Sequence, residues 1–450
     1  MKFTKYSLFF SVLLVESILL FLLAPRHYDY NFNLFCMIQY FVSSFLFLKA
    51  KKKQNYFDFD MIFMFTYFFV MFFYPVFMFQ SDPTKYFAFQ YEFNENVISR
   101  ATALSLLGMQ AYFSGSLSFS NKQFKKMLPQ KKYNSITTFS IISFVSFFLF
   151  IISGGYARLA GEYSGEAVEA SGAASYFWVF SPAFLFCAIA FQFNNLYIID
   201  QNKFRLKYLN KFLILYLFFF VGMILVAGSR TYPLQIILIC CSLFTLFYKP
   251  ISFFKFIPLI IIGVLAMFGI NLLRGGDTTL ELVDSVMDLV ICNRNTYVSI
   301  DYVDVHGLTF GKSMLSVLLA PIPMMQSIIF SIFNIDSWDT SSALIISRIS
   351  LGDKGSLGFG TNIIADLYMS FGLLGVVFFM FLLGKYIAKL LYFAKNNIYA
   401  LVGYSVMISY SVFIVRAEFF FFSRFLLWGL FFVFCLDVYN NSIKRNNLKQ

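Results

Sequence analysis

Apolar runs of about 17 to 25 residues recur along almost the whole chain. A helix needs about 20 mostly apolar residues to cross the roughly 30 Å of hydrocarbon in a bilayer, and it satisfies its own backbone hydrogen bonds there. The pattern therefore predicts an all-α polytopic membrane protein that forms one integral membrane domain over residues 1–450. Twelve runs of this kind lie near residues 5–24, 31–48, 59–79, 97–119, 135–152, 177–194, 210–227, 234–248, 256–272, 361–383, 398–415 and 419–436.

The basic residues indicate which connections face the cytoplasm. With both termini inside, 23 of the 35 Lys and Arg residues fall in cytoplasmic segments, in line with the positive-inside rule. This topology accounts for the net charge of +12 without a nucleic-acid partner. The first run begins like a signal peptide but is long and lacks a small-residue cleavage site, so we expect it to stay as the first span. Five of the six cysteines lie in apolar runs, and no zinc or disulfide spacing is present.

One external loop, residues 273–360 between the ninth and tenth runs, is far longer than a simple reversal of the chain requires. We expect the chemistry to take place there. Within the loop, the apolar segment 311–333 is interrupted by Pro321 and Pro323, which disfavour a continuous helix. We interpret this segment as a re-entrant or interfacial helix, and the alternative is a thirteenth span that would reverse the orientation of everything after it.

Arginines near the outer boundary are candidates for binding an anionic substrate. Arg230 lies between two apolar runs, and Arg274 follows a run beside two glycines. Arg294 and Arg348 lie in the large loop. The alternatives are a side chain that extends to the interface, a helix-end anchor or a surface ion pair. An arginine in apolar surroundings is costly, however, and usually pairs with or binds another group.

Two residues are candidates for a general base. His306 lies in the external loop, and an imidazole exchanges protons near neutral pH, although a single loop histidine is more often packed than catalytic. Asp366 lies one turn inside an apolar run, where an ionisable side chain is expected to face a polar cavity rather than lipid. The first external loop holds a weaker candidate, His27.

Three other patterns are given no functional role. The segment GLTFGKS resembles a phosphate-binding loop but has His306 where the pattern needs glycine. In the DFD sequence, Asp58 is expected to cap a helix rather than bind a metal. Asp301 and Asp304 are expected to lie on a solvated loop face. The sequence thus predicts no metal site and no cofactor.

The segment GFGTNIIADLYMSFGLLGVVFFMFLLG (358–384) resembles the Wzy-type oligosaccharide repeat-unit polymerases, which assemble O-antigens and capsules. The same resemblance covers GSR at 228–230 and GLTFGKSMLSVLLAPIP at 307–323. It extends over roughly residues 210–384. The pattern usually has glutamate where Asp366 stands, and an arginine where Met324 follows the loop prolines. These two departures affect the roles of single residues more than the family.

The resemblance implies that lipid-linked repeat units are polymerised on the outer face of the bacterial cytoplasmic membrane. A growing glycan would pass from a polyprenyl diphosphate to a sugar hydroxyl of a new unit, with a chain-length regulator as a possible partner. Arginines would hold the diphosphate, Tyr368 would contact substrate, and His306 or Asp366 would be the base. Two alternatives stay open: another polyprenyl-linked glycan transferase or ligase, which Asp29 in the first external loop also suits, and a flippase for lipid-linked glycans.

Overall fold

The computed structural model describes residues 5–119, 131–164, 171–273, 284–352 and 358–447. These residues form helices and turns, and no β-strand occurs among them. The predicted all-α fold class is therefore confirmed. Each of the twelve apolar runs contains a helix.

The chain divides into two compact units. Unit 1 contains residues 1–121, 251–388 and 411–421, and unit 2 contains residues 122–250, 389–410 and 422–450. The boundary at 388 falls inside one long helix, α16 (Ile363–Phe393).

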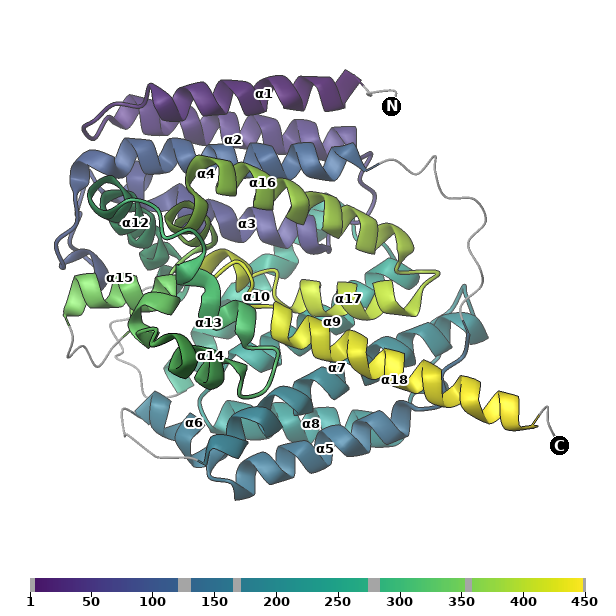
Figure 1. Cartoon of the computed structure of the whole chain (residues 1–450). Coiled ribbons are helices and arrows are strands. Elements are labelled where there is room, and N and C mark those ends of the chain that lie inside the picture. The colour runs from purple at the N-terminus through teal and green to yellow at the C-terminus, as the bar shows by residue number, and fades with distance from the viewer. Residues whose placement is uncertain (1–4, 120–130, 165–170, 274–283, 353–357, 448–450) are drawn as a thin grey trace. The chain divides into compact units, whose positions relative to one another are not determined.

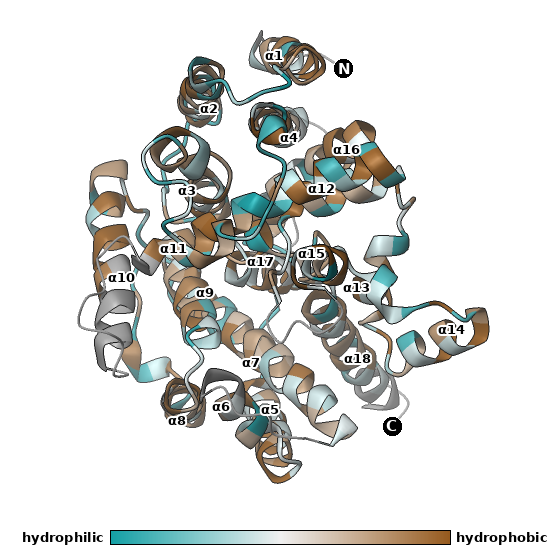
Figure 2. Ribbon diagram, turned by 90° about the vertical axis from the view of Figure 1, so that its left-hand side faces the viewer, coloured by the Kyte–Doolittle hydropathy of each residue, from teal (hydrophilic) through white to brown (hydrophobic). Residues whose placement is uncertain are grey.

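Unit 1 begins with four helices and later adds those of the large loop. Its α-helices are α1 (Lys5–Leu22), α2 (Tyr30–Ala50), α3 (Phe59–Met71), α4 (Ile98–Ser118), α10 (Phe253–Leu273), α11 (Asp284–Val290), α12 (Arg294–His306), α13 (Leu315–Leu319), α14 (Met325–Phe333), α15 (Ser342–Leu351) and most of α16. Short helical turns are η1 (Tyr74–Met78), η2 (Phe87–Phe89), η3 (Glu95–Val97), η6 (Ile291–Asn293), η7 (Lys312–Met314), η8 (Ser337–Thr340) and η9 (Ile414–Arg416). Helices α1, α2 and α4 run side by side (Figures 1 and 2).

Glycines allow α4 and α16 to cross very closely. A Cβ atom added to Gly115 would lie 1.9 Å from the carbonyl oxygen of Phe381, and one added to Gly384 would lie 2.1 Å from that of Tyr112. Only residues without a side chain permit such a backbone approach, which is typical of helix packing in membranes.

Helix α16 is divided by a break at Gly372. This residue has φ 64° and ψ −153°, a conformation that is essentially restricted to glycine. The sequence predicts one continuous span here, because the apolar run is not interrupted. The structure instead gives a first half that belongs with the loop helices and a second half that continues to Phe393.

The segment 311–333 is divided at its prolines, as expected from Pro321 and Pro323. Helix α13 ends at Leu319, and α14 begins at Met325 after a left-handed residue, Met324. At nine residues, α14 is about 14 Å long, too short to cross a bilayer. Its location in or on the membrane stays a prediction.

Unit 2 contains α5 (Ile136–Ile152), α6 (Gly155–Ser164), α7 (Gly172–Ile199), η5 (Leu206–Tyr208), α8 (Lys211–Val226), α9 (Thr231–Phe247), α17 (Ile398–Ser409) and α18 (Ser423–Asn447). Three hydroxyl groups join α5, α7 and α8 inside it. The Ser143 Oγ lies 3.0 Å from the Tyr216 hydroxyl, which lies 3.1 Å from the Ser181 Oγ. A shared hydrogen-bond network of this kind satisfies polar groups that lipid would leave unpaired.

Several helices have the length and composition to cross a membrane. In the described part of the chain these are Tyr30–Ala50, Gly172–Ile199, Ile363–Phe393 and Ser423–Ser442. A fifth results if α5 and α6, which are bent by 68°, form one broken span. These helices support a multi-pass membrane protein. The number of twelve spans and the cytoplasmic location of both termini stay predictions.

Candidate functional site

A small apolar core in unit 1 joins α12, α15 and the first half of α16. It consists of Val298, Ile345, Ile346, Ala365 and Met369. The side chains of Ser341 and Asn362 accept backbone N–H groups in the first turns of α15 and α16, which fixes where these two helices begin. Hydrophilic residues are concentrated around α12 (Figure 2).

Asp366 lies in the first turn of α16 and is fully buried. Its Oδ1 accepts a hydrogen bond from the Ser342 Oγ over 2.6 Å, and its Oδ2 accepts one from the Phe419 N–H over 2.8 Å. Because a buried carboxylate is costly without hydrogen bonds, these contacts hold α15 and the segment before α18 against α16. In this arrangement a substrate hydroxyl has no access to Asp366.

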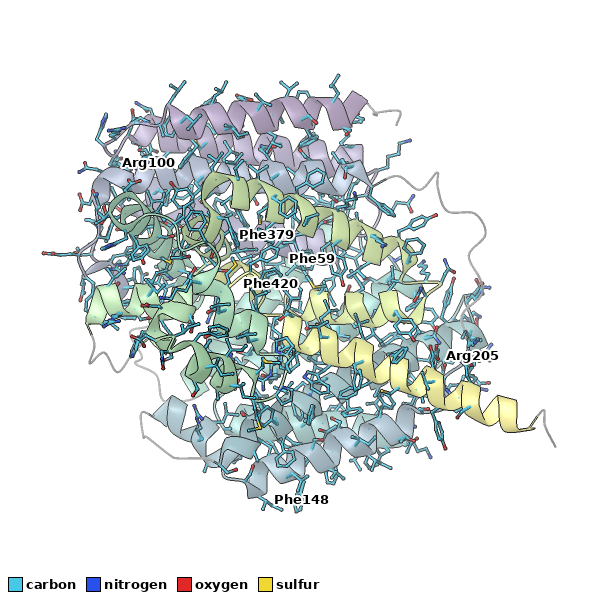
Figure 3. All side chains as sticks on the ribbon, viewed as in Figure 1. Phe59, Arg100, Phe148, Arg205, Phe379 and Phe420 are labelled. Carbon is cyan, nitrogen blue, oxygen red and sulfur yellow. The ribbon has the colours of Figure 1, made fainter. Side chains whose placement is uncertain are left out.

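A second carboxylate, Glu418, lies close to Asp366 and interacts with it electrostatically. The Ser341 Oγ donates to the Glu418 Oε1 over 2.6 Å, so that two consecutive serines hold the two carboxyl groups. Glu418 is half-buried. Burial raises its pKa, and the Ser341 hydrogen bond opposes that effect. The rings of Phe379 and Phe420 pack edge to face beside this segment, at 5.9 Å between centroids (Figure 3).

The loop after α12 contacts α16 directly before its break. The Thr309 N–H donates to the Met369 carbonyl oxygen over 3.0 Å, and the Ser313 Oγ lies 2.8 Å from the Ser370 Oγ. A Cβ atom at Gly372 would lie 3.3 Å from the side chain of Leu308. Two of the three segments that carry the family resemblance therefore pack against each other.

Arg294, at the start of α12, is fully buried. Its Nη1 donates to the Ser350 Oγ over 2.7 Å, and its Nη2 donates to the Glu92 carbonyl oxygen over 2.8 Å. The guanidinium lies over the rings of Phe93 and Phe359, while its Nε has no hydrogen-bond partner. Burial lowers the pKa of Arg294 to about 10, so it is still charged at neutral pH.

His306 is the last residue of α12 and is exposed, with its ring 4.8 Å from that of Tyr302. Two residues earlier in α12, Asp304 accepts two hydrogen bonds from Arg100, over 2.5 and 3.2 Å. Figure 3 shows Arg100 near the beginning of α4. Tyr368, which is 6% exposed, also forms a side-chain hydrogen bond with Arg100. Tyr368, which is predicted to contact substrate, therefore shares its partner Arg100 with Asp304.

Among the other predicted arginines, only Arg348 belongs to the described part of unit 1. Arg348 is exposed on α15 and pairs with Asp336 over 3.7 Å. Arg230 belongs to unit 2, where it is half-buried at the N-cap position of α9. Arg274 lies outside the described residues.

The two aspartates of the DFD sequence have structural partners. The Asp58 side chain accepts the Met61 N–H, which confirms its predicted role as a helix cap. Lys53 Nζ lies 2.7 Å from Asp58 and 3.2 Å from Asp60. Asp301, which the sequence places on a solvated loop face, accepts a hydrogen bond from Asn94. Over the described ranges, no three His, Cys, Asp or Glu side chains are grouped to hold a metal ion.

Sequence reasoning missed Arg100, Glu418 and Arg424. Arg100 and Arg424 each lie inside an apolar run, and this unusual location is a signal that could have identified them. Glu418 lies between two apolar runs, where an acid is unremarkable, and its neighbour Asp366 is 52 residues away in the sequence.

Comparison with known proteins gave one finding. The sequence model of the protein family described as O-antigen polysaccharide polymerase Wzy matches residues 4–446, nearly the whole chain. No curated protein and no solved structure matched the chain.

Proposed function

The chain belongs to the O-antigen polysaccharide polymerase Wzy family, and we propose that it joins oligosaccharide repeat units carried on polyprenyl diphosphate. The reaction takes place on the outer face of the bacterial cytoplasmic membrane. The family match over residues 4–446 carries the proposal, and the large external loop with its polar helices supports it. A chain-length regulator is the expected protein partner.

The reaction is a glycosyl transfer. The bond between the anomeric carbon of the growing chain and its diphosphate breaks, and a new glycosidic bond forms to a hydroxyl of the incoming lipid-linked unit. The proton of that hydroxyl passes to a general base, and polyprenyl diphosphate leaves as an anion. The energy of the lipid-diphosphate bond drives the reaction, so that no soluble cofactor is needed.

We assign the base to His306 and a positioning role to Asp366. A base must reach the proton directly or through one water molecule. His306 is exposed at the end of α12 and is open to a substrate hydroxyl, whereas both oxygens of the buried Asp366 are occupied by Ser342 and the Phe419 N–H. Asp366 then fixes the geometry of α15 and α16 around the reacting groups.

Arginines stabilise the diphosphate as negative charge develops on it. We assign this role to Arg230 and Arg274, with Arg348 and Tyr368 contacting the sugars. Arg294 also lies in the large loop, residues 273–360, but its guanidinium is enclosed by the rings of Phe93 and Phe359. We therefore propose that Arg294 positions α12, and that it reaches substrate only if this enclosure opens.

The proposal is tested in cells that lack the native gene and express variants at normal membrane levels. His306→Ala and Asp366→Asn should leave single repeat units on the cell surface, because units still cross the membrane but are not joined. His27→Ala, which removes the only other histidine, should leave chain length unchanged. Units trapped inside would indicate a flippase, and finished polymer retained on lipid would indicate a ligase. Normal chain length in both variants would remove these residues from the mechanism.

A further inference from the structure

Unit 2 contains a cluster of aromatic residues around one arginine, Arg424. This residue is the second of α18, and its guanidinium carbon lies 5.9 Å from the ring centroid of Tyr176, near the start of α7. Arg424 also interacts electrostatically with the phenol groups of Tyr232 and Tyr410. Tyr232 lies in the first turn of α9, with its ring 4.5 Å from that of Trp178. Residues near the starts of α7, α9 and α18 therefore come together at this arginine.

Arg424 has no anionic partner among the residues that the structure describes. Its Nε is buried without a hydrogen-bond partner, and the groups that interact with it electrostatically are phenols rather than carboxylates. Arg205, in the same unit, shows the ordinary arrangement, because its Nε donates to the Asp200 carboxylate over 2.8 Å. The two arginines therefore differ in what satisfies their charge.

An arginine inside an apolar run is costly unless it pairs with or binds another group. The surroundings of Arg424 suit an anion. The N-termini of α7, α9 and α18 add partial positive charge, and phenol groups can donate hydrogen bonds. Arg230 is the N-cap residue of α9, two residues before Tyr232, so a second arginine belongs to that helix start.

We propose that Arg424 binds a phosphate group of a polyprenyl diphosphate, with Tyr176, Tyr232 and Tyr410 surrounding it as hydrogen-bond donors. The phosphate is assigned to the diphosphate rather than to a lipid headgroup, because the cluster offers several hydrogen-bond donors at the predicted outer boundary of the membrane. This assignment rests on the proposed function, since it takes its ligand from the lipid-linked substrates. It assigns a substrate-binding role to a residue of the last helix, within unit 2.

The test is a direct binding measurement with the full chain in lipid nanodiscs. Polyprenyl diphosphate without sugar is the probe, and native mass spectrometry reports the bound fraction. Arg424→Gln should weaken binding by about 10- to 100-fold, as expected for the loss of one or two charge-assisted hydrogen bonds. Arg424→Lys keeps the charge but loses the forked geometry, so its affinity for the probe should lie between those of the parent and Arg424→Gln. Arg205→Gln is the matched control and should bind like the parent.

A parallel series with phosphatidylglycerol separates the two sources of phosphate. The proposal predicts that Arg424→Gln changes diphosphate binding and leaves phosphatidylglycerol binding unchanged. If Arg424→Gln weakens the binding of both ligands equally, the cluster binds lipid headgroups and the proposal is wrong. Unchanged binding of polyprenyl diphosphate would also overturn the proposal. Tyr232→Phe and Tyr410→Phe keep the aromatic packing and should each weaken diphosphate binding a few-fold. These two variants test the proposal if Arg424→Gln does not fold.

Failure of this inference differs from failure of the proposed function. If the parent chain polymerises lipid-linked units but Arg424→Gln binds diphosphate normally, the function stands and the Arg424 site is wrong. If Arg424→Gln loses diphosphate binding but the parent forms no polymer, the site stands and the reaction is wrong.

Discussion

Arg294 is a buried cation that is satisfied by a serine hydroxyl, a backbone carbonyl and two aromatic faces. Lysine keeps the charge but cannot reproduce the planar fork or lie flat between the rings. We expect Arg294→Lys to reduce the free energy of unfolding by about 1–3 kcal/mol, because buried partners lose hydrogen bonds. Thermal unfolding in detergent measures this, with the exposed Arg205→Lys as control. A variant that is as stable as the parent yet does not polymerise would instead assign Arg294 to substrate binding.

Glu418 gives the protein a pH dependence with a definite sign. Burial raises the pKa of Glu418 in the folded state, so the folded chain binds this proton more tightly than the unfolded chain. The stabilisation is complete below the unfolded pKa of about 4.3 and is lost as pH rises through the higher folded pKa. Glu418→Gln is neutral at every pH and keeps an acceptor for Ser341.

The expected result is that the melting temperature of Glu418→Gln relative to the parent increases as pH rises from about 4 to 8. The measurement is thermal unfolding across this range, and Glu95→Gln, which alters an exposed acid, is the control. Parallel pH profiles for Glu418→Gln and the parent would contradict the burial argument.

At the scale of elements, the break in α16 is the feature most directly tied to one residue. Gly372 has a backbone conformation that costs other residues about 1–3 kcal/mol, and a Cβ atom there would meet Leu308. Gly372→Ala should therefore lower the amount of folded protein in membranes and shorten surface glycan. Gly222→Ala, where the added Cβ meets nothing within 4 Å, is the matched control. Equal stability and chain length in the two variants would show that the break is dispensable.

The segment 311–333 decides the orientation of all later helices. If it does not cross the membrane, residues before and after it face the same side. Cysteines introduced at Val305 and Asp336, which are 71% and 52% exposed, should both react with an impermeant thiol reagent in intact spheroplasts. The background carries Cys435→Ser, because Cys435 is the one native cysteine that is exposed. Reaction at only one position would establish a thirteenth span.

Much of the element content follows from local sequence. Each of the twelve apolar runs predicted a helix that the structure has, Pro321 and Pro323 predicted the division of 311–333, and Asp58 predicted a cap. Helix α12, which at 13 residues is as long as α3, lies outside the apolar runs and was not predicted. The break at Gly372 was not predictable in the same way, since glycine occurs within continuous membrane helices as well. Its conformation depends on the contact with Leu308, 64 residues earlier in the sequence.

For the whole molecule, the composition of the site depends on contacts between distant segments. Asp366, Ser342 and Phe419 come from three segments, and only the fold brings them together. The same holds for Arg100, Asp304 and Tyr368. Sequence reasoning named Asp366 from its position in an apolar run and Tyr368 from the family resemblance. It could not identify their partners, because a serine or a loop acid has no distinctive signal until its neighbour is known.

The central claim is that the chain forms glycosidic bonds at the expense of lipid-linked diphosphate. The most direct measurement reconstitutes the purified chain in liposomes with its lipid-linked repeat unit and counts the polyprenyl diphosphate released against the bonds formed. We expect a ladder of products and one polyprenyl diphosphate released for each new bond, both abolished in His306→Ala. Repeat units that cross the liposome membrane without being joined, or a ladder formed without release of polyprenyl diphosphate, would contradict it.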